Sequence, residues 1–487
     1  MDRLLSRSGL VPALLALALL TGCEQPPLLE RVKERGVLRI ATVAGPLSCY
    51  LDEKGPAGLE YELARRFAHT LASKADFKVF PTRLAALEAL KRGEVQMVAA
   101  ARQPSSLDRK HFRLSIPWYS APLVFASAMG RPPLKALEKP PQDPVVVPAD
   151  SLQQELLQAM ASAFPIEIET LPDRSEEAIL DEVNQSSVSH TLVNRALLRV
   201  WKSLYPSLVQ GREISEPQGF HWFFSRLHDA SLAAAASRFL EKQQANGTLP
   251  KLLQRYITKV PRRNFVTLRD FWKHVKERLP RYEELFREAG RATGIDWRLL
   301  AAVGYQESHW QPTAMSPTGV RGIMMLTRDA ARKEKIGNRT DPAQSIAGGA
   351  RHLRWMEKRI PARIQEPDRL WLTLASYNIG YGHLEDARVL TQNGGGNPDR
   401  WEDVKKFLPL LSRKKYYSTV KHGKARGGEP VVYVENIRYY YRLLAWWDNR
   451  RRGLDCTSSS HPRLALKKAR SNSPQLSAST PPSTAVK

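Results

Sequence analysis

The chain has 487 residues, with 74 Lys and Arg against 49 Asp and Glu, 42% hydrophobic residues and three cysteines. Its length predicts two or three domains, its 25% of charged residues excludes a generally disordered chain, and three cysteines are too few for a disulfide-built fold. The net charge of +25 is uneven, because residues 259–455 contain 38 basic and 22 acidic residues. We therefore expect an anionic partner for that part of the chain.

The first residues have the pattern of an export signal. Arg3 and Arg7 precede a short apolar run, which ends in Leu20-Thr21-Gly22-Cys23. This ending resembles a bacterial lipobox, which implies a signal peptide at 1–22, lipidation of Cys23 and a tether at 23–32. Glu24 after the cysteine resembles a signal for the outer membrane, so we expect a peripheral lipoprotein that faces the periplasm. A plain secretory signal is the alternative.

Two other cysteines, Cys49 and Cys456, form one potential pair in an oxidising compartment. They fall in different predicted domains, which argues against a disulfide between them. The sequence leaves their pairing open.

The chain after the tether alternates between strand and helix patterns. The predicted elements, in chain order, are a strand at 37–41, a helix around 63–71, a strand at 77–80, a helix at 84–90 and a strand at 95–100. Such alternation predicts a parallel sheet covered on both faces. Prolines between 132 and 148 mark a crossover, a second α/β stretch runs to about 225, and residues 232–256 are expected to be helical.

The strand signal disappears beyond Pro261. Residues 266–450 show successive helical patterns separated by Gly and Pro, which predicts a separate α domain at 265–455, after a short basic linker at Lys259–Arg262. The tail at 456–487 is rich in Ser, Pro and Lys, and we expect it to be disordered.

Three short motifs of the first domain resemble the family 3 extracellular solute-binding proteins: Gly58–Ala64, Lys91–Val98 and Asn246–Leu249. The resemblance implies that residues 33–258 form a bilobal α/β periplasmic-binding-protein fold. It also implies a regulatory, non-catalytic domain that binds a small amino-acid or muropeptide ligand between its lobes. Arg102 is the candidate contact for a ligand carboxylate. Gln96 departs from the family, which usually has Asp there.

Glu307 is the candidate catalytic residue of the second domain. Asp296 is a suitable N-cap for a helix over Trp297–Ser308, on which Leu300, Val303 and Glu307 share one apolar face. Partial burial and the negative end of the helix dipole both disfavour the charged carboxylate. We therefore expect a raised pKa, which suits a general acid near neutral pH.

Glu307-Ser308 is followed by Gly322–Thr327, by Ala375–Gly380 and later by Tyr433–Ile437. Together these segments resemble the lysozyme-like soluble lytic transglycosylase domain over about 275–450. The resemblance implies cleavage of the MurNAc–GlcNAc β-1,4 bond of peptidoglycan without water or a cofactor, giving 1,6-anhydro-MurNAc ends. Such an enzyme is a carbon–oxygen lyase, and we expect an exolytic one, although the residues do not separate exolytic from endolytic action. One departure is Met325, which stands where the family has Gln.

The same resemblance assigns roles to four further residues. Ser308 and Tyr377 would position the substrate, Asn378 would hold the loop beside Glu307, and Met324 would form part of the cleft wall. From the residues alone, Asn378 could equally make only a turn, and Met324 could be only core.

Two other functions compete with the lyase. One is a non-enzymatic receptor whose domains only bind ligands, although the presence of Glu307 favours an enzyme. The other is a lysozyme-type hydrolase, which needs a second carboxylate such as Asp329 or Glu334.

The histidines lack the spacing of a metal site, so no metal is expected. Because the chain carries an export signal, the basic runs at 413–415 and 450–452 are interpreted as solvated faces and not as a nucleic-acid site.

Overall fold

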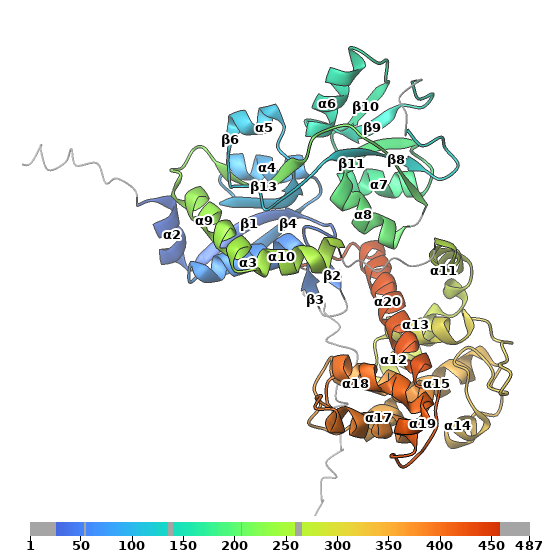
Figure 1. Ribbon diagram of the computed structural model, residues 1–487. Coiled ribbons are helices and arrows are strands. Elements are labelled where there is room, and N and C mark those ends of the chain that lie inside the picture. Colours follow the sequence, from blue (N-terminus) through green and yellow to red (C-terminus); the bar gives the residue numbers. More distant parts are fainter. Residues whose placement is uncertain (1–25, 53–54, 135–139, 206, 259–264, 458–487) are drawn as a thin grey trace, which may run out of the picture. The chain divides into compact units, whose positions relative to one another are not determined.

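The computed structural model describes residues 26–52, 55–134, 140–205, 207–258 and 265–457 (Figure 1). The expected signal peptide, Cys23, the basic linker and nearly all of the expected tail lie outside these residues. Within the described residues, no helix is long and apolar enough to cross a membrane. The chain divides into two compact units, the first built mainly from Pro56–Leu268 and the second mainly from Arg269–Gly453.

The first lobe of the first unit is a mixed sheet with strand order β4-β1-β5-β13-β6, to which β7 adds by pairing with β13. Strands β4 and β5 both run parallel to β1, which confirms the predicted parallel arrangement, but β13 is antiparallel to β5. The strands are β1 (Val37–Val43), β4 (Lys74–Phe80), β5 (Met97–Arg102), β6 (Phe112–Leu114), β7 (Tyr119–Ala121) and β13 (Gln218–Ser225).

The second lobe has a five-stranded sheet of order β10-β9-β11-β8-β12, in which β8 is antiparallel to both of its neighbours. Its strands are β8 (Leu123–Ala128), β9 (Val145–Pro148), β10 (Ile168–Leu171), β11 (His190–Asn194) and β12 (Leu208–Glu213). A separate two-stranded sheet pairs β2 (Tyr50–Asp52) with β3 (Gly55–Ala57). The bilobal α/β fold expected from the sequence is therefore present.

Helices pack on these sheets through their apolar faces, and several begin at a side-chain cap. Thr82 caps α4 by accepting from the Ala85 N–H at 3.1 Å, and Ser175 caps α7 in the same way. The helices of this unit are α2 (Leu28–Arg35), α3 (Leu59–Thr70), α4 (Arg83–Lys91), α5 (Ser106–His111), α6 (Leu152–Ala161), α7 (Glu176–Asn184), α8 (Arg195–Leu204), α9 (Ser231–Ala245) and α10 (Thr248–Leu253).

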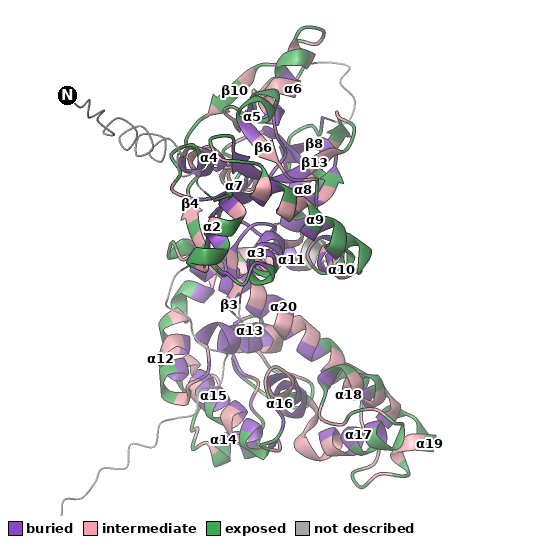
Figure 2. Ribbon diagram, turned by 90° about the vertical axis from the view of Figure 1, so that its left-hand side faces the viewer, coloured by how far each residue is buried: buried purple, intermediate pink, exposed green. Residues whose placement is uncertain are grey.

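The second unit is helical, as the sequence predicts. Its longest helix is α20 (Gly428–Arg451), which packs against α13 and α16. Helix α13 is buried along most of its length (Figure 2). The remaining helices are α11 (Phe265–Glu277), α12 (Glu283–Thr293), α13 (Trp297–Ser308), α14 (Arg328–Lys333), α15 (Pro342–Arg359), α16 (Asp368–Ile379), α17 (Tyr381–Asn393), α18 (Trp401–Phe407) and α19 (Lys414–Tyr417).

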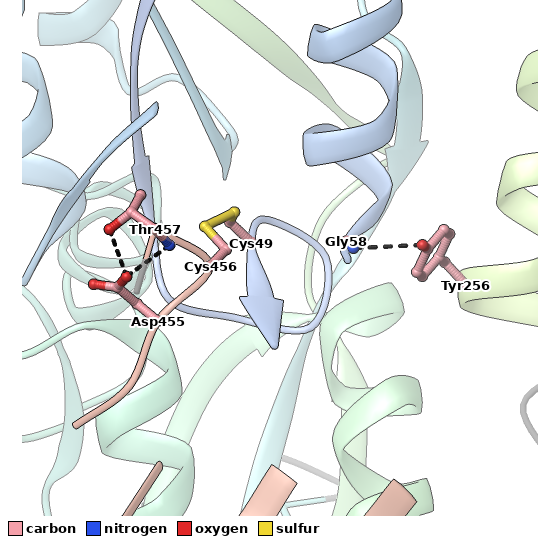
Figure 3. The surroundings of a disulfide bond; sticks show 6 residues. All are labelled: Cys49, Gly58, Tyr256, Asp455, Cys456 and Thr457. Atoms are coloured by element: carbon pink, nitrogen blue, oxygen red, sulfur yellow. Dashed lines mark hydrogen bonds between the residues drawn. A yellow bond between two sulfur atoms is a disulfide. The ribbon is translucent and has the colours of Figure 1, made fainter. Parts of the chain in front are cut away.

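Each unit includes a short segment from the other part of the chain. Leu51–Gly55 groups with the second unit, where the Leu51 carbonyl accepts a hydrogen bond from Asn449 Nδ2 at 3.1 Å. Leu454–Ser458 groups with the first unit, where Cys456 forms a disulfide with Cys49 (Figure 3). The two cysteines thus lie in one unit and not in different domains as expected, because the residues after α20 return to the first unit.

Candidate active site

A hydrogen-bond network fixes the beginning of α13. The Asp296 carboxylate accepts from the backbone N–H of Arg298 at 2.9 Å and from the Tyr441 hydroxyl at 2.9 Å. Arg298 pairs with Asp296 and also donates to Asn449 Oδ1 at 3.0 Å. Because Tyr441 and Asn449 are on α20, these contacts hold α13 at a fixed position against that helix.

Glu307 lies in the last turn of α13, and its side chain is only partly buried. Tyr433 of α20, itself 4% exposed, donates a hydrogen bond to Glu307 Oε1 at 2.6 Å. Burial raises the pKa of Glu307 from its usual 4.5 to about 7, while the hydrogen bond from Tyr433 acts in the opposite direction. A carboxyl group with this pKa can give a proton at neutral pH and take one back.

Tyr377 of α16 lies near the same carboxyl group. Its hydroxyl donates to the Met324 carbonyl at 2.9 Å. Burial, and then the negative charge of Glu307, raises the pKa of Tyr377 well above its usual value. The same two causes act on Tyr433, so both tyrosines keep their protons and remain donors beside Glu307.

Ser308 connects α13 to the turn at 322–326. Its hydroxyl is buried and bonds with the carbonyls of Gly304 at 3.1 Å and Ile323 at 2.9 Å. Gly322 begins this turn with a φ of +86°, and a Cβ there would lie 1.8 Å from the Arg339 carbonyl oxygen, so only glycine fits. Ser308 thus positions the turn beside Glu307, whereas its predicted contact with the substrate stays a prediction.

The Met324 side chain is fully buried and packs against Gly349 and Gly304, so it forms core between α13 and α15. Its backbone faces the site, because its carbonyl accepts from Tyr377. Met325, which replaces the family's Gln, is partly exposed and adopts a φ of +46°. Of the two methionines, Met325 is therefore the one whose side chain is accessible.

Asn378 is exposed at the end of α16. Its side chain has no hydrogen-bond partner among the residues that the structure describes. The proposed role of Asn378 in holding the loop beside Glu307 stays a prediction.

The two other carboxylates considered for a hydrolase are differently placed. The Asp329 side chain is 91% exposed and pairs with Arg332. Glu334 pairs with Arg351 at 3.3 Å and lies 3.8 Å from His352 Nδ1, and its charge contributes to the raised pKa of Tyr377. Neither donates to or accepts from Glu307 in any contact of the described residues. Within those residues there is also no group of three or more His, Cys, Asp or Glu able to hold a metal ion.

Tyr433 is a candidate site residue that the sequence did not reveal. It opens the segment Tyr433–Ile437, which carried part of the family resemblance but received no role. A tyrosine on a long, largely buried helix is usually core, and Tyr433 lies 126 positions from Glu307. Only the packing of α20 on α13 brings the two together.

A pocket lies between the two lobes of the first unit. Thr82, Arg83 and Arg102 line it from the first lobe, and Ser151, Ser175 and Glu176 are among its residues from the second lobe. Arg102, the candidate ligand contact, does line this pocket. However, its Nε donates to Asp108 Oδ2 at 2.7 Å, and a terminal nitrogen donates to the Asp150 carbonyl at 2.5 Å.

Beside this pocket, Arg83 and Glu177 form a buried ion pair that crosses between the lobes. Both guanidinium ends donate to Glu177 oxygens at 2.8 Å, and Arg83 Nε donates to the Ala100 carbonyl at 2.7 Å. Burial opposes the charge of Arg83, but the carboxylates of Glu177, Glu176 and Glu60 together outweigh it and raise the pKa of Arg83. Gly45 leaves space for this carboxylate, since a Cβ there would lie 2.6 Å from Glu177 Oε1.

Comparison with known proteins agrees with both parts of the chain. Residues 284–399 match the family model "Transglycosylase SLT domain", and residues 38–259 match "Bacterial extracellular solute-binding proteins, family 3". A solved structure similar to the first unit is an ancestral arginine-binding protein bound to arginine, 21% identical, with a TM-score of 0.41 over 46% of this chain and 98% of that chain.

Two relatives are similar over nearly the whole chain. A membrane-bound lytic murein transglycosylase F of Marinobacter nauticus is 41% identical over 90% of this chain and 88% of its own length. A protein of the same name from Alcanivorax borkumensis is 40% identical over 88% of this chain and 92% of its own length. The chain is thus a peptidoglycan lytic transglycosylase, a lyase with an N-terminal binding domain, and it belongs to the membrane-bound lytic murein transglycosylase F family.

Proposed function

We propose that Glu307 alone serves as acid and base in cleavage of the MurNAc–GlcNAc β-1,4 bond. Protonated Glu307 gives its proton to the glycosidic oxygen, and the bond from that oxygen to the anomeric carbon of MurNAc breaks. The carboxylate then takes the proton of the MurNAc C6 hydroxyl, whose oxygen bonds to the anomeric carbon. The products are a 1,6-anhydro-MurNAc end and a free GlcNAc hydroxyl, and Glu307 is protonated again.

The observation that carries this proposal is the raised pKa of a partly accessible carboxyl group beside two protonated tyrosines. One group that titrates near pH 7 can act in both directions, so a second carboxylate is not needed. A hydrolase would instead use two carboxylates, about 5–9.5 Å apart, to activate a water molecule or form a covalent intermediate. Tyr433 holds the Glu307 carboxyl group, and Tyr377 holds the turn that forms one side of the site.

The test of this proposal is a set of four variants assayed on purified peptidoglycan. Glu307→Gln should lower the rate by more than about 10⁴-fold, because a residue with only one of the two roles contributes about 10²–10⁴-fold. Asp329→Asn and Glu334→Gln, separately and combined, should cleave at close to the rate of the unchanged protein. A loss in the combined variant as large as that of Glu307→Gln would contradict the single-residue mechanism.

For localisation, we propose that acylation of Cys23 anchors the protein to the outer membrane, with both units in the periplasm. The lipobox-like sequence supports this, as does the name "membrane-bound" of the relatives. Cys23→Ser should release the protein from the membrane fraction, because no acyl chain would then be added. A variant that still needs detergent for its release would contradict a lipid anchor at Cys23.

For the first unit, we propose that the pocket between the lobes binds an amino acid or a muropeptide and that binding changes the lyase rate. The N-termini of α4, α6 and α7 line the pocket and suit a carboxylate, and the guanidinium of Arg102, which lines it too, would share its hydrogen bonds between Asp108 and the ligand. A ligand can alter the rate only if its affinity differs between two arrangements of the protein. Calorimetry with amino acids and muropeptides tests the binding, and activity measured in parallel tests the change in lyase rate. Binding without a rate change would contradict the regulatory part.

A further inference from the structure

Arg359, the last residue of α15, is held between two aromatic rings. Its guanidinium lies 4.9 Å from the ring centroid of Trp355 and 4.3 Å from that of Tyr381, the first residue of α17. Both rings are partly buried, while Arg359 itself is exposed. Such cation–π contacts fix the position of a guanidinium group without neutralising its charge.

In the described part of the chain, Arg359 is held by aromatic rings and not by an ion pair. Among the residues that the structure describes, no carboxylate pairs with its guanidinium. The carboxylates around it are engaged elsewhere: Glu357, two positions before Arg359, pairs with Arg354 and Arg369, and Glu385 of α17 pairs with Arg388 and bonds to the Tyr381 hydroxyl. Lys333 of α14 also lies over the Trp355 ring, so two cations share this aromatic residue.

This cationic cluster, Arg359 and Lys333 around Trp355, adjoins the candidate active site. The His352 ring lies 5.5 Å from Trp355 on one side and 5.6 Å from Tyr377 on the other. Tyr381 follows Tyr377 by four residues, across the bend at Gly380. Tyr377 in turn lies beside Glu307, whose charge acts on it. A glycan strand cleaved at Glu307 would therefore place its substituents within reach of the cluster.

We propose that the cationic cluster binds the carboxylates of the stem peptides that peptidoglycan strands carry, with Arg359 as the main contact. The inference rests on the proposed function at Glu307. A guanidinium group presents a planar fork that matches a carboxylate, and a fork already ordered by two rings loses little freedom on binding. The cluster makes the enzyme selective for strands that carry peptides over bare glycan.

The test compares two substrates with the full chain. One is soluble, uncross-linked glycan strands with their stem peptides, and the other is the same strands after an amidase has removed the peptides. The ratio of kcat/KM on the first to kcat/KM on the second measures the selectivity. Arg359→Gln should lower this ratio about five- to tenfold, and Arg359→Gln with Lys333→Gln should lower it further. Raising the salt concentration should lower the ratio for the unchanged protein but hardly for the double variant.

Lys358→Gln is the matched control, since Lys358 is a neighbouring exposed basic residue on the same helix without a contact to Trp355 or Tyr381. It should leave the ratio unchanged. An equal loss on both substrates for Arg359→Gln, or a fall in the ratio for Lys358→Gln, would overturn the proposal. Arg359→Lys keeps the positive charge but lacks the planar guanidinium group. It should give a ratio between that of the unchanged protein and that of Arg359→Gln. Activity of Glu307→Gln on either substrate would instead contradict the proposed function itself.

Discussion

The hydroxyl of Tyr433 donates a 2.6 Å hydrogen bond to Oε1 of Glu307 across 126 positions of the chain. Burial favours the neutral carboxyl group, whereas this bond favours the carboxylate. The balance leaves the pKa of Glu307 at about 7, close to the pH at which a residue must both give and take a proton. Tyr433 is therefore a positioning residue that also adjusts the acidity of Glu307.

Replacing Tyr433 with Phe removes this bond and should raise the pKa of Glu307 further. The high-pH limb of the pH–rate profile, which reports loss of the protonated acid, should then move to higher pH. The maximal rate should fall about tenfold, because the carboxyl group is no longer held. The profile of kcat/KM between pH 5 and 9 measures both effects.

Tyr417→Phe serves as the control, since Tyr417 is a partly exposed tyrosine of α19 without a bond to Glu307. Its profile should match that of the unchanged protein. A Tyr433→Phe profile with the high-pH limb in its original place would contradict the role assigned to this bond.

Glu307→Gln should change stability in a direction that depends on pH. The pKa of Glu307 is higher in the folded protein than its usual 4.5, so ionisation destabilises the fold progressively as the pH rises from about 4.5 to about 7. The variant cannot ionise, and above pH 7 it should be more stable than the unchanged protein by about 1–3 kcal/mol. Urea unfolding of the second unit at pH 4 and pH 8 measures the difference in unfolding free energy between the variant and the unchanged protein. The same difference at both pH values would contradict the raised pKa.

The elements of the fold follow closely from local sequence patterns. The strands expected at 37–41, 77–80 and 95–100 appear as β1, β4 and β5: β1 and β5 are mostly buried apolar runs, and β4 is the partly exposed strand at the edge of the sheet. The antiparallel strand β13 was not foreseen, since it joins the first sheet after more than 100 intervening residues. The pairing of a strand with a sheet formed by a distant part of the chain cannot be predicted from local hydrophobic periodicity.

The same limit applies to the candidate site. Glu307 could be found because helix periodicity and a recognisable motif both point to it, and its raised pKa agrees with the expectation. The burial of Met324 and the internal hydrogen bonds of Ser308 depend on how α13 packs against α15 and the turn at 322–326. Cys49 and Cys456 lie 407 positions apart, and their disulfide depends on a chain segment that returns to the first unit.

Glu177→Gln should destabilise the first unit by about 3–5 kcal/mol, because it leaves the buried Arg83 without its carboxylate. Replacing both residues, as in Arg83→Met with Glu177→Leu, should recover most of this loss, since no buried charge remains. Chemical unfolding of the first unit measures both variants. If Glu177→Gln alone is as stable as the unchanged protein, Arg83 does not depend on Glu177 for its pairing.

Removing the disulfide should also destabilise the first unit. Replacing Cys49 and Cys456 with Ser frees a loop of roughly 400 residues in the unfolded chain, and the loss should be about 2–4 kcal/mol. Unfolding experiments with and without reductant measure the change in the unchanged protein. The stability of the serine variant should not change when reductant is added. If reductant lowers the stability of both proteins equally, the disulfide is not the cause of the loss.

The most direct test of the single-residue mechanism is the mass of the fragments that the purified protein releases from peptidoglycan. If the MurNAc C6 hydroxyl attacks the anomeric carbon, each fragment ends in a 1,6-anhydro sugar and is lighter by one water than a hydrolytic product. Mass spectrometry should find only such fragments with the unchanged protein and none with Glu307→Gln. Reducing ends from the unchanged protein, or anhydro ends from Glu307→Gln, would contradict the account.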